Sequence, residues 1–130
     1  MIVDSSALVA ILRAEPELEE FSQAIEEADT VRMSVVSYVE AAVVIDAPRD
    51  PIVTRRFDEV IRTVPIEVVE VTLRQAEIAR EAYRDFGRGS GHPARLNFGD
   101  CFTYALAKDL DEPLLFKGEY FSKTDVNIAL

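Results

Sequence analysis

The chain has 130 residues, 48% of them hydrophobic and 29% charged, which excludes a disordered or fibrous protein and favours one globular domain over residues 1–130. No apolar run is long enough to cross a bilayer, and no basic segment followed by an apolar one resembles a signal peptide. We therefore expect a cytoplasmic protein with no membrane association. The single cysteine, Cys101, excludes an intrachain disulfide and is expected to be a buried core thiol.

The net charge of −10 limits how this chain would hold a polyanion. Proteins that bind nucleic acid by charge alone usually carry a basic surface. A polyanionic substrate therefore requires bridging cations or local basic patches. An acidic surface equally suits a basic protein partner.

Hydrophobic periodicity and capping residues predict strands that alternate with helices along the chain. The strands are expected at residues 1–3, 32–35, 67–71 and 113–116. The helices are expected at residues 5–12, 17–28, 37–45, 51–63, 73–86 and 98–110. This alternation predicts a three-layer α/β fold in which a mainly parallel central sheet is flanked by helices.

Three apolar segments each contain a single charged residue. The only charged residue is Asp4 in residues 1–12, Glu40 in residues 33–45 and Asp100 in residues 96–107. A buried carboxylate must pair, protonate or bind a metal, and none of the three segments contains a Lys or Arg. Since strand ends and following helix starts share one edge of a parallel sheet, the three acids are expected to meet there and to bind Mg²⁺.

Each acid also has a structural interpretation. Asp4 could cap the first helix, Glu40 could belong to a capping box that starts at Ser37, and Asp100 could complement its helix dipole. These roles do not explain why each segment lacks any other charge. We therefore interpret the three acids together as a metal site suited to phosphodiester hydrolysis.

Several segments, in order, resemble PIN-domain nucleases and specifically the VapC toxins of bacterial toxin–antitoxin pairs. They are IVDSSAL at 2–8, SYVE at 37–40, LNFGDCF at 96–102, LLFKG at 114–118 and FSKTD at 121–125. The resemblance covers essentially the whole chain. It implies a Mg²⁺- or Mn²⁺-dependent endoribonuclease that cuts structured RNA, such as tRNA or an rRNA loop. It also implies a homodimer and inhibition by a cognate VapB antitoxin.

The resemblance assigns roles to particular residues. Asp4 and Asp100 would be the principal metal ligands, and Glu40 would be a ligand directly or through water. Ser6 would hydrogen-bond within the site or cap the first helix. Many PIN domains carry a fourth acid after the last strand, and here Gly118 occupies one alignment of that position. Glu119 is the expected fourth acid, and Asp125 is the reserve candidate.

A loop at residues 87–95 contains three of the five glycines, and its Arg88 and Arg95 could contact RNA phosphates. A solvated linker with incidental arginines is the alternative. His92, the only histidine, is expected at the surface rather than as a general acid. Lys117 could contact phosphate or remain solvated, and the sequence does not choose between these roles.

Other classes of protein place acids at strand ends. A response-regulator receiver needs paired acids after its first strand, whereas Asp4 is single and followed by serines. A phosphatase of the haloacid dehalogenase type needs a second Asp where Ser6 stands. A catalytically silent PIN-like module that binds RNA or antitoxin is compatible with the sequence, and a cleavage assay with and without EDTA distinguishes it.

Overall fold

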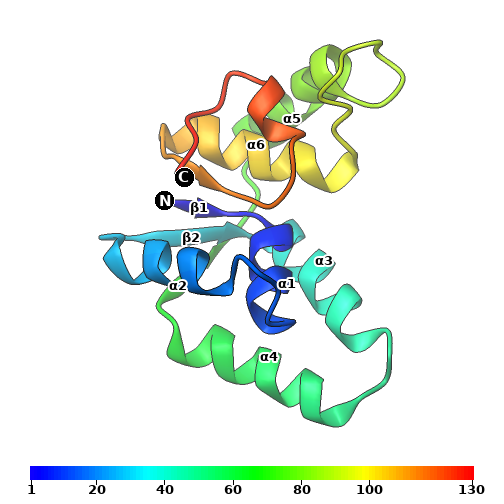
Figure 1. Ribbon diagram of the computed structural model, residues 1–130. Coiled ribbons are helices and arrows are strands. Elements are labelled where there is room, and N and C mark those ends of the chain that lie inside the picture. The colour runs from blue at the N-terminus through cyan, green and yellow to red at the C-terminus, as the bar shows by residue number, and fades with distance from the viewer.

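The computed structural model describes residues 1–130 as strands and helices in alternation (Figure 1). The strands are β1 (Ile2–Val3), β2 (Val31–Ser34), β3 (Ile66–Val69) and β4 (Leu114–Leu115). The helices are α1 (Ser5–Leu12), α2 (Leu18–Glu27), α3 (Val35–Asp46), α4 (Pro51–Thr63), α5 (Leu73–Phe86) and α6 (Phe98–Leu110), followed by a 3₁₀ turn η1 (Phe121–Lys123). None of these helices has both the length and the apolar character needed to span a membrane.

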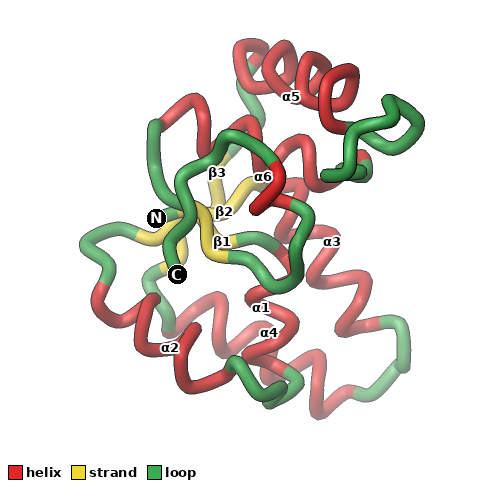
Figure 2. Tube along the Cα trace, turned by 45° about the horizontal axis from the view of Figure 1, so that its top comes forward, coloured by secondary structure: helices red, strands yellow, loops and turns green.

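The four strands form one sheet in the order β3-β2-β1-β4, and every neighbouring pair is parallel. Figure 2 shows this sheet at the centre of the molecule, with helices around it. The predicted three-layer α/β fold with a parallel central sheet is therefore confirmed. Because β1 is a central strand, the residue that follows it, Asp4, emerges in the middle of the carboxyl edge of the sheet.

Each face of the sheet has its own hydrophobic core. Val3 and Leu115 point into the core beneath α1, α2, α3 and α4, whereas Ile2 and Leu114 point into the core beneath α5 and α6. All four side chains are at most 1% exposed. This burial on both faces explains why β1 and β4 contain only apolar residues, as expected for strands inside a parallel sheet.

The start of α3 differs from the sequence prediction. The helix begins at Val35, and Ser34 caps it by accepting a hydrogen bond from the Val36 N–H at 3.3 Å. Ser37 is fully buried inside the helix, so the predicted capping box between Ser37 and Glu40 is wrong. Glu40 consequently lies in the second turn of α3 and is free for another role.

The large apolar side chains of α5 are not the ones that it buries. Leu73 and Tyr83 are 77% and 50% exposed, whereas Gln75, Ala79 and Ala82 are buried. Small alanine side chains allow α5 to pack closely on α6, which leaves the larger side chains at the rim. The third strand likewise begins one residue earlier than predicted, because Ile66 pairs with Val31 of β2.

Candidate active site

Asp4 is buried at the carboxyl end of β1. Its Oδ2 accepts hydrogen bonds from the Ser6 N–H at 3.0 Å and the Ser6 hydroxyl at 2.6 Å, and its Oδ1 accepts one from the Thr103 hydroxyl at 2.7 Å. The side chain is 3% exposed and forms no salt bridge. Asp4 is therefore an N-cap of α1, as the alternative interpretation predicted, and also a buried carboxylate with no cationic partner.

Asp100 lies in the first turn of α6. It forms a reciprocal capping box with Asn97, in which the Asn97 N–H donates to Asp100 Oδ2 and the Asp100 N–H donates to Asn97 Oδ1, both at 2.8 Å. This box satisfies two backbone donors at the helix start. It occupies only one carboxylate oxygen, so Asp100 has acceptor capacity for a ligand.

Glu40 reaches from α3 to the start of α6. A Cβ atom built on Gly99 would lie 1.9 Å from Glu40 Oε1, so only the hydrogen of a glycine fits beside this carboxylate. Burial, followed by the negative charges of Asp4 and Asp100, raises the pKa of Glu40 to about 7, and hydrogen bonding from Ser5 partly opposes the rise. Glu40 is therefore close to both of the other predicted acids.

The same environment acts on Asp100. Burial is the largest effect and raises the pKa of Asp100 to about 6, with a further rise from the charge of Asp4. The Asn97 backbone hydrogen bond and the positive charge of Arg88 act in the opposite direction. Three carboxylates from distant parts of the chain thus lie within electrostatic reach of one another, as the sequence predicted.

The chemistry of these donors fits a hard divalent cation. The three groups offer only carboxylate oxygens, their charges repel, and no Lys or Arg forms a salt bridge with any of them. Mg²⁺ and Mn²⁺ prefer such oxygen ligands. As the side chains lie, no three acidic, histidine or cysteine groups are arranged closely enough to hold an ion. Binding would therefore require carboxylate side chains to turn toward a common point.

The two candidates for a fourth acid have partners other than these three acids. The side chain of Glu119 is 87% exposed, and its Oε2 lies 4.0 Å from the ammonium of Lys123. Asp125 accepts a hydrogen bond from the Tyr104 hydroxyl at 2.6 Å and pairs with Lys108 at 3.1 Å. Asp125 therefore has a structural role, and the role of Glu119 remains a prediction that its exposed placement does not favour.

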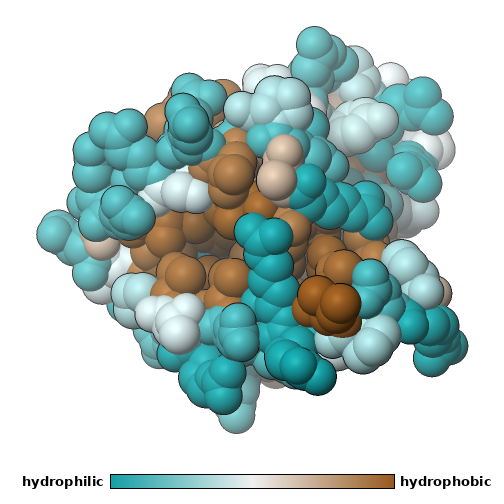
Figure 3. Space-filling view, turned by 60° about the horizontal axis from the view of Figure 1, so that its bottom comes forward, coloured by the Kyte–Doolittle hydropathy of each residue, from teal (hydrophilic) through white to brown (hydrophobic).

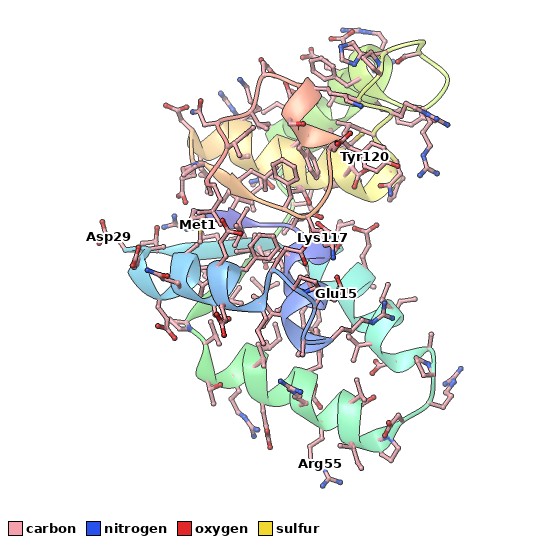
Figure 4. All side chains as sticks on the ribbon, viewed as in Figure 1. Met1, Glu15, Asp29, Arg55, Lys117 and Tyr120 are labelled. Carbon is pink, nitrogen blue, oxygen red and sulfur yellow. The ribbon has the colours of Figure 1, made fainter.

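Lys117 is held by acidic partners. Its ammonium contacts Glu15 at 2.5 Å and Glu17 at 3.0 Å, and Figure 4 shows Lys117 beside Glu15. These contacts raise the pKa of Lys117, so its charge is directed to the loop before α2 rather than to a phosphate. Its backbone N–H donates to the Ser6 hydroxyl at 3.0 Å, which connects the end of β4 to the Asp4 cap.

The glycine-rich loop begins and ends beside the candidate site. Hydrogen bonds between Arg88 and Leu96 and between Leu96 and Phe86 close its base. The side chains of Arg88 and Arg95 are exposed. His92 packs edge-on against Phe86, and its Nδ1 accepts a hydrogen bond from the Ala94 N–H at 3.1 Å. Arg88 is the loop arginine whose charge acts on Asp100.

Sequence reasoning missed several residues that shape the site. Thr103 and Ser37 are fully buried polar residues that connect to Asp4, and Gly99 makes room for Glu40. A signal was present, because Thr103 lies three residues after Asp100 and Ser37 lies three residues before Glu40. This spacing places each hydroxyl near its acid on one side of a helix. Burial of the Cys101 thiol raises its pKa to about 11, which agrees with a core role.

The protein is thus an α/β protein with a group of carboxylates at the carboxyl edge of its parallel sheet. Comparison with known proteins identifies its family. The PIN domain family model matches residues 1–127, so the chain belongs to the PIN domain family. Ribonuclease VapC28 of Mycobacterium tuberculosis is 54% identical over 130 residues, covering 100% of this chain and 98% of that protein.

Solved structures share the fold at low sequence identity. The crystal structure of VapC20 of Mycobacterium tuberculosis, described as a sarcin-ricin loop cleaving toxin, has a TM-score of 0.76 at 16% identity, covering 96% of this chain and 95% of that chain. A toxin–antitoxin complex from Klebsiella pneumoniae has a TM-score of 0.70 at 15% identity, covering 93% of this chain and 89% of that chain. These likenesses confirm the PIN-like α/β fold.

Proposed function

We propose that the chain is a metal-dependent endoribonuclease of the VapC type that hydrolyses structured RNA, such as tRNA or an rRNA loop. The observation that carries the proposal is the proximity of Asp4, Glu40 and Asp100, each in an otherwise uncharged segment and none in a salt bridge. The 54% identity to a VapC ribonuclease over the whole chain supports the same activity. An RNA substrate is consistent with the expected cytoplasmic location.

The three acids divide the chemistry between them. Asp4 and Asp100 would hold a Mg²⁺ or Mn²⁺ ion, which would lower the pKa of water and offset charge on the phosphate. Glu40 would orient the attacking water and accept its proton, since burial and the charges of Asp4 and Asp100 make it the more basic carboxylate in the metal-free protein. The water oxygen bonds to phosphorus as the bond to the 3′ oxygen breaks, and the leaving 3′ oxygen takes up a proton from solvent water. The products are a 5′-phosphate and a 3′-hydroxyl.

The decisive experiment is cleavage of total tRNA and rRNA by the purified protein, with Mg²⁺, with Mn²⁺ and with EDTA. Cleavage that needs the metal and is lost in Asp4→Asn and Asp100→Asn supports the proposal, provided that both variants retain the helical circular dichroism of the parent. Mapping of the new 5′ ends identifies the RNA and the bases that are cut. A fully active Asp100→Asn variant would contradict the assigned site.

A catalytically silent module that binds RNA or antitoxin is the alternative function. It predicts RNA binding without metal-dependent cleavage, and binding that survives Asp100→Asn. The 54% identity to a VapC ribonuclease favours the enzyme, whereas the clustered carboxylates suit either a bound cation or a basic side chain of a partner.

We also propose a VapB-type antitoxin as partner. An apolar groove of about 440 Å³ lies between α2 and α4, and its lining includes Ile11, Ile25, Val60 and Val64. Figure 3 shows hydrophobic residues around a hollow on the face of the molecule that carries α4. A partner segment with an apolar face fits this groove. At the separate acidic site, a basic side chain of the partner would compete with the metal.

Competition between antitoxin and metal can be measured directly. A peptide from the C-terminal part of the cognate antitoxin, titrated into the protein at rising Mn²⁺ concentrations, should bind more weakly as the metal saturates. Simultaneous binding of peptide and metal would count against entry of a basic side chain into the site.

A homodimer completes the proposed assembly. Val35, Val39 and Val43 follow one another at helical spacing on α3 and are 38%, 52% and 61% exposed. Such a row of exposed valines supports a protein contact. Light scattering of the parent and of Val43→Asp tests this contact. A variant that remains a dimer would show that the interface does not include this row of valines.

A further inference from the structure

A chain of buried hydroxyl groups approaches Asp4 from the interior of the protein. The Ser37 hydroxyl on α3 lies 2.8 Å from the Thr103 hydroxyl on α6, which lies 2.7 Å from Asp4 Oδ1. Ser37 and Thr103 are both 0% exposed. The chain therefore runs through the protein interior and joins two helices to the carboxylate after β1.

The number of available protons fixes which group donates and which accepts in this series of hydrogen bonds. A hydroxyl group has one proton to donate, and an ionised carboxylate only accepts. When Asp4 is ionised, Thr103 must donate to it, so Thr103 has only acceptor capacity left for Ser37. Ser37 must therefore donate to Thr103. On the other side, Ser6 accepts from the Lys117 N–H at 3.0 Å and donates to Asp4 Oδ2 at 2.6 Å. Both hydroxyl protons that reach Asp4 are thus held toward it.

The hydrogen-bonded hydroxyl groups also connect the two helices that carry Glu40 and Asp100. Ser37 lies one turn before Glu40 on α3, and Thr103 lies one turn after Asp100 on α6. A bond between the two hydroxyls therefore fixes α3 against α6 close to where the carboxylates meet. Ser and Thr in helix interiors compete with the backbone for hydrogen bonds, so packing alone would favour Ala and Val at these positions.

We propose that Ser37 and Thr103 are positioning residues, which fix the orientation in which the Asp4 carboxylate binds the metal. This inference rests on the proposed function, because it needs Asp4 to be a metal ligand. Hydrogen-bond partners of metal ligands typically contribute about 10–100-fold to metal affinity or activity. Thr103 and Ser37 would act in this way through Asp4, without touching metal or RNA.

The test compares Thr103→Val, which removes the hydroxyl at similar volume, with Thr103→Ser, which keeps it. Mn²⁺ affinity is measured by calorimetry, and the free energy of unfolding is measured separately without metal. We expect Thr103→Val to weaken Mn²⁺ binding about 10-fold or more, and Thr103→Ser to stay within about 3-fold of the parent. Ser37→Ala, one step further from Asp4, should give a smaller loss.

Thr54→Val is the matched control. The Thr54 hydroxyl donates to Asp46 Oδ1 at 2.6 Å near the far end of α3, so this variant also breaks a bond from a hydroxyl to a carboxylate. It should change stability but not Mn²⁺ affinity. A purely structural role for Thr103 predicts the same result for Thr103→Val.

Parental Mn²⁺ affinity in Thr103→Val, or an equal loss in Thr103→Val and Thr103→Ser, would overturn the proposal. If Thr103→Val does not fold, Ser37→Ala decides, and parental affinity in that variant overturns the proposal as well. Failure of the proposed function is distinguishable, because the parent itself would then bind no Mn²⁺ and cut no RNA. A parent that binds Mn²⁺ and cuts RNA, with hydroxyl variants that equal it, removes the positioning role alone.

Discussion

The carboxylate of Glu40 lies against the Cα of Gly99, so that a Cβ atom on Gly99 would fall 1.9 Å from Glu40 Oε1 and 2.3 Å from Oε2. Gly99 immediately precedes Asp100 in α6, whereas Glu40 comes from α3. The missing side chain therefore allows two acids from different helices to approach each other. A glycine within a helix costs stability relative to alanine, and here it provides space at the candidate site.

Gly99→Ala should reduce cleavage without unfolding the protein. The new methyl group meets only the end of a partly exposed side chain, so Glu40 is displaced and the backbone need not move. We expect a loss of about 10-fold or more in kcat, which is part of the roughly 10²–10⁴-fold that a general base contributes, and a change in unfolding free energy within about 1 kcal/mol. Steady-state cleavage and urea denaturation measure the two quantities.

A double-mutant cycle identifies the cause of that loss. If Gly99→Ala acts by displacing Glu40, it should add little further loss to a Glu40→Gln protein. Independent, multiplying losses in the two variants would mean that Gly99 affects the site by another route.

The metal-free protein should become less stable as the pH rises from about 5 to about 8. The pKa values of Glu40 and Asp100 are raised to about 7 and about 6, above their ordinary values of 4.5 and 3.8. In this pH range the folded protein therefore holds protons that the unfolded chain has released, and stability falls as pH rises. One pKa unit corresponds to about 1.4 kcal/mol, and solvent screening reduces the total to about 1–2 kcal/mol.

Urea denaturation at a series of pH values, in the presence of EDTA, measures this slope. Glu40→Gln should flatten it, because the residue with the larger rise in pKa no longer titrates. Saturating Mn²⁺ should also flatten or reverse it, since the ion stabilises the ionised carboxylates. Stability of the metal-free parent that increases between pH 5 and pH 8 would show that the pKa values of Glu40 and Asp100 are not raised in the folded protein.

Glu119 and Asp125 should behave differently when neutralised. Glu119→Gln is expected to leave both cleavage and stability near parental values, because the side chain is 87% exposed. Asp125→Asn should lower the unfolding free energy by about 1 kcal/mol, because it weakens the bonds to Tyr104 and Lys108, and should leave kcat unchanged. A large loss of kcat in Glu119→Gln would restore Glu119 as the fourth acid of the site.

The sequence predicted the three acids because each stands alone in an apolar segment, and burial makes such isolation informative. It also predicted that they lie near one another, because Asp4 follows a strand and Asp100 begins a helix, and these positions share one edge of a parallel sheet. It did not predict the contact of Glu40 with Gly99, or the bond from Thr103 to Asp4, because both depend on how α3 and α6 pack. The exposure of Leu73 on α5 could not be predicted for the same reason, because alanine packing against α6 outweighs the apolar character of Leu73.

Arg88→Ala should weaken RNA binding more than it slows the chemical step. Arg88 is exposed at the start of the glycine-rich loop, forms no salt bridge within the chain, and lies close enough to Asp100 for its charge to lower that pKa. If Arg88 contacts a phosphate, the substitution should raise KM several-fold and leave kcat within about 2-fold. It should also reduce the slope of log binding constant against log salt concentration by about one. Arg62→Ala on α4, another exposed arginine without a salt bridge, is the matched control. Equal effects of the two substitutions would indicate a general contribution of positive charge rather than a contact beside the carboxylates.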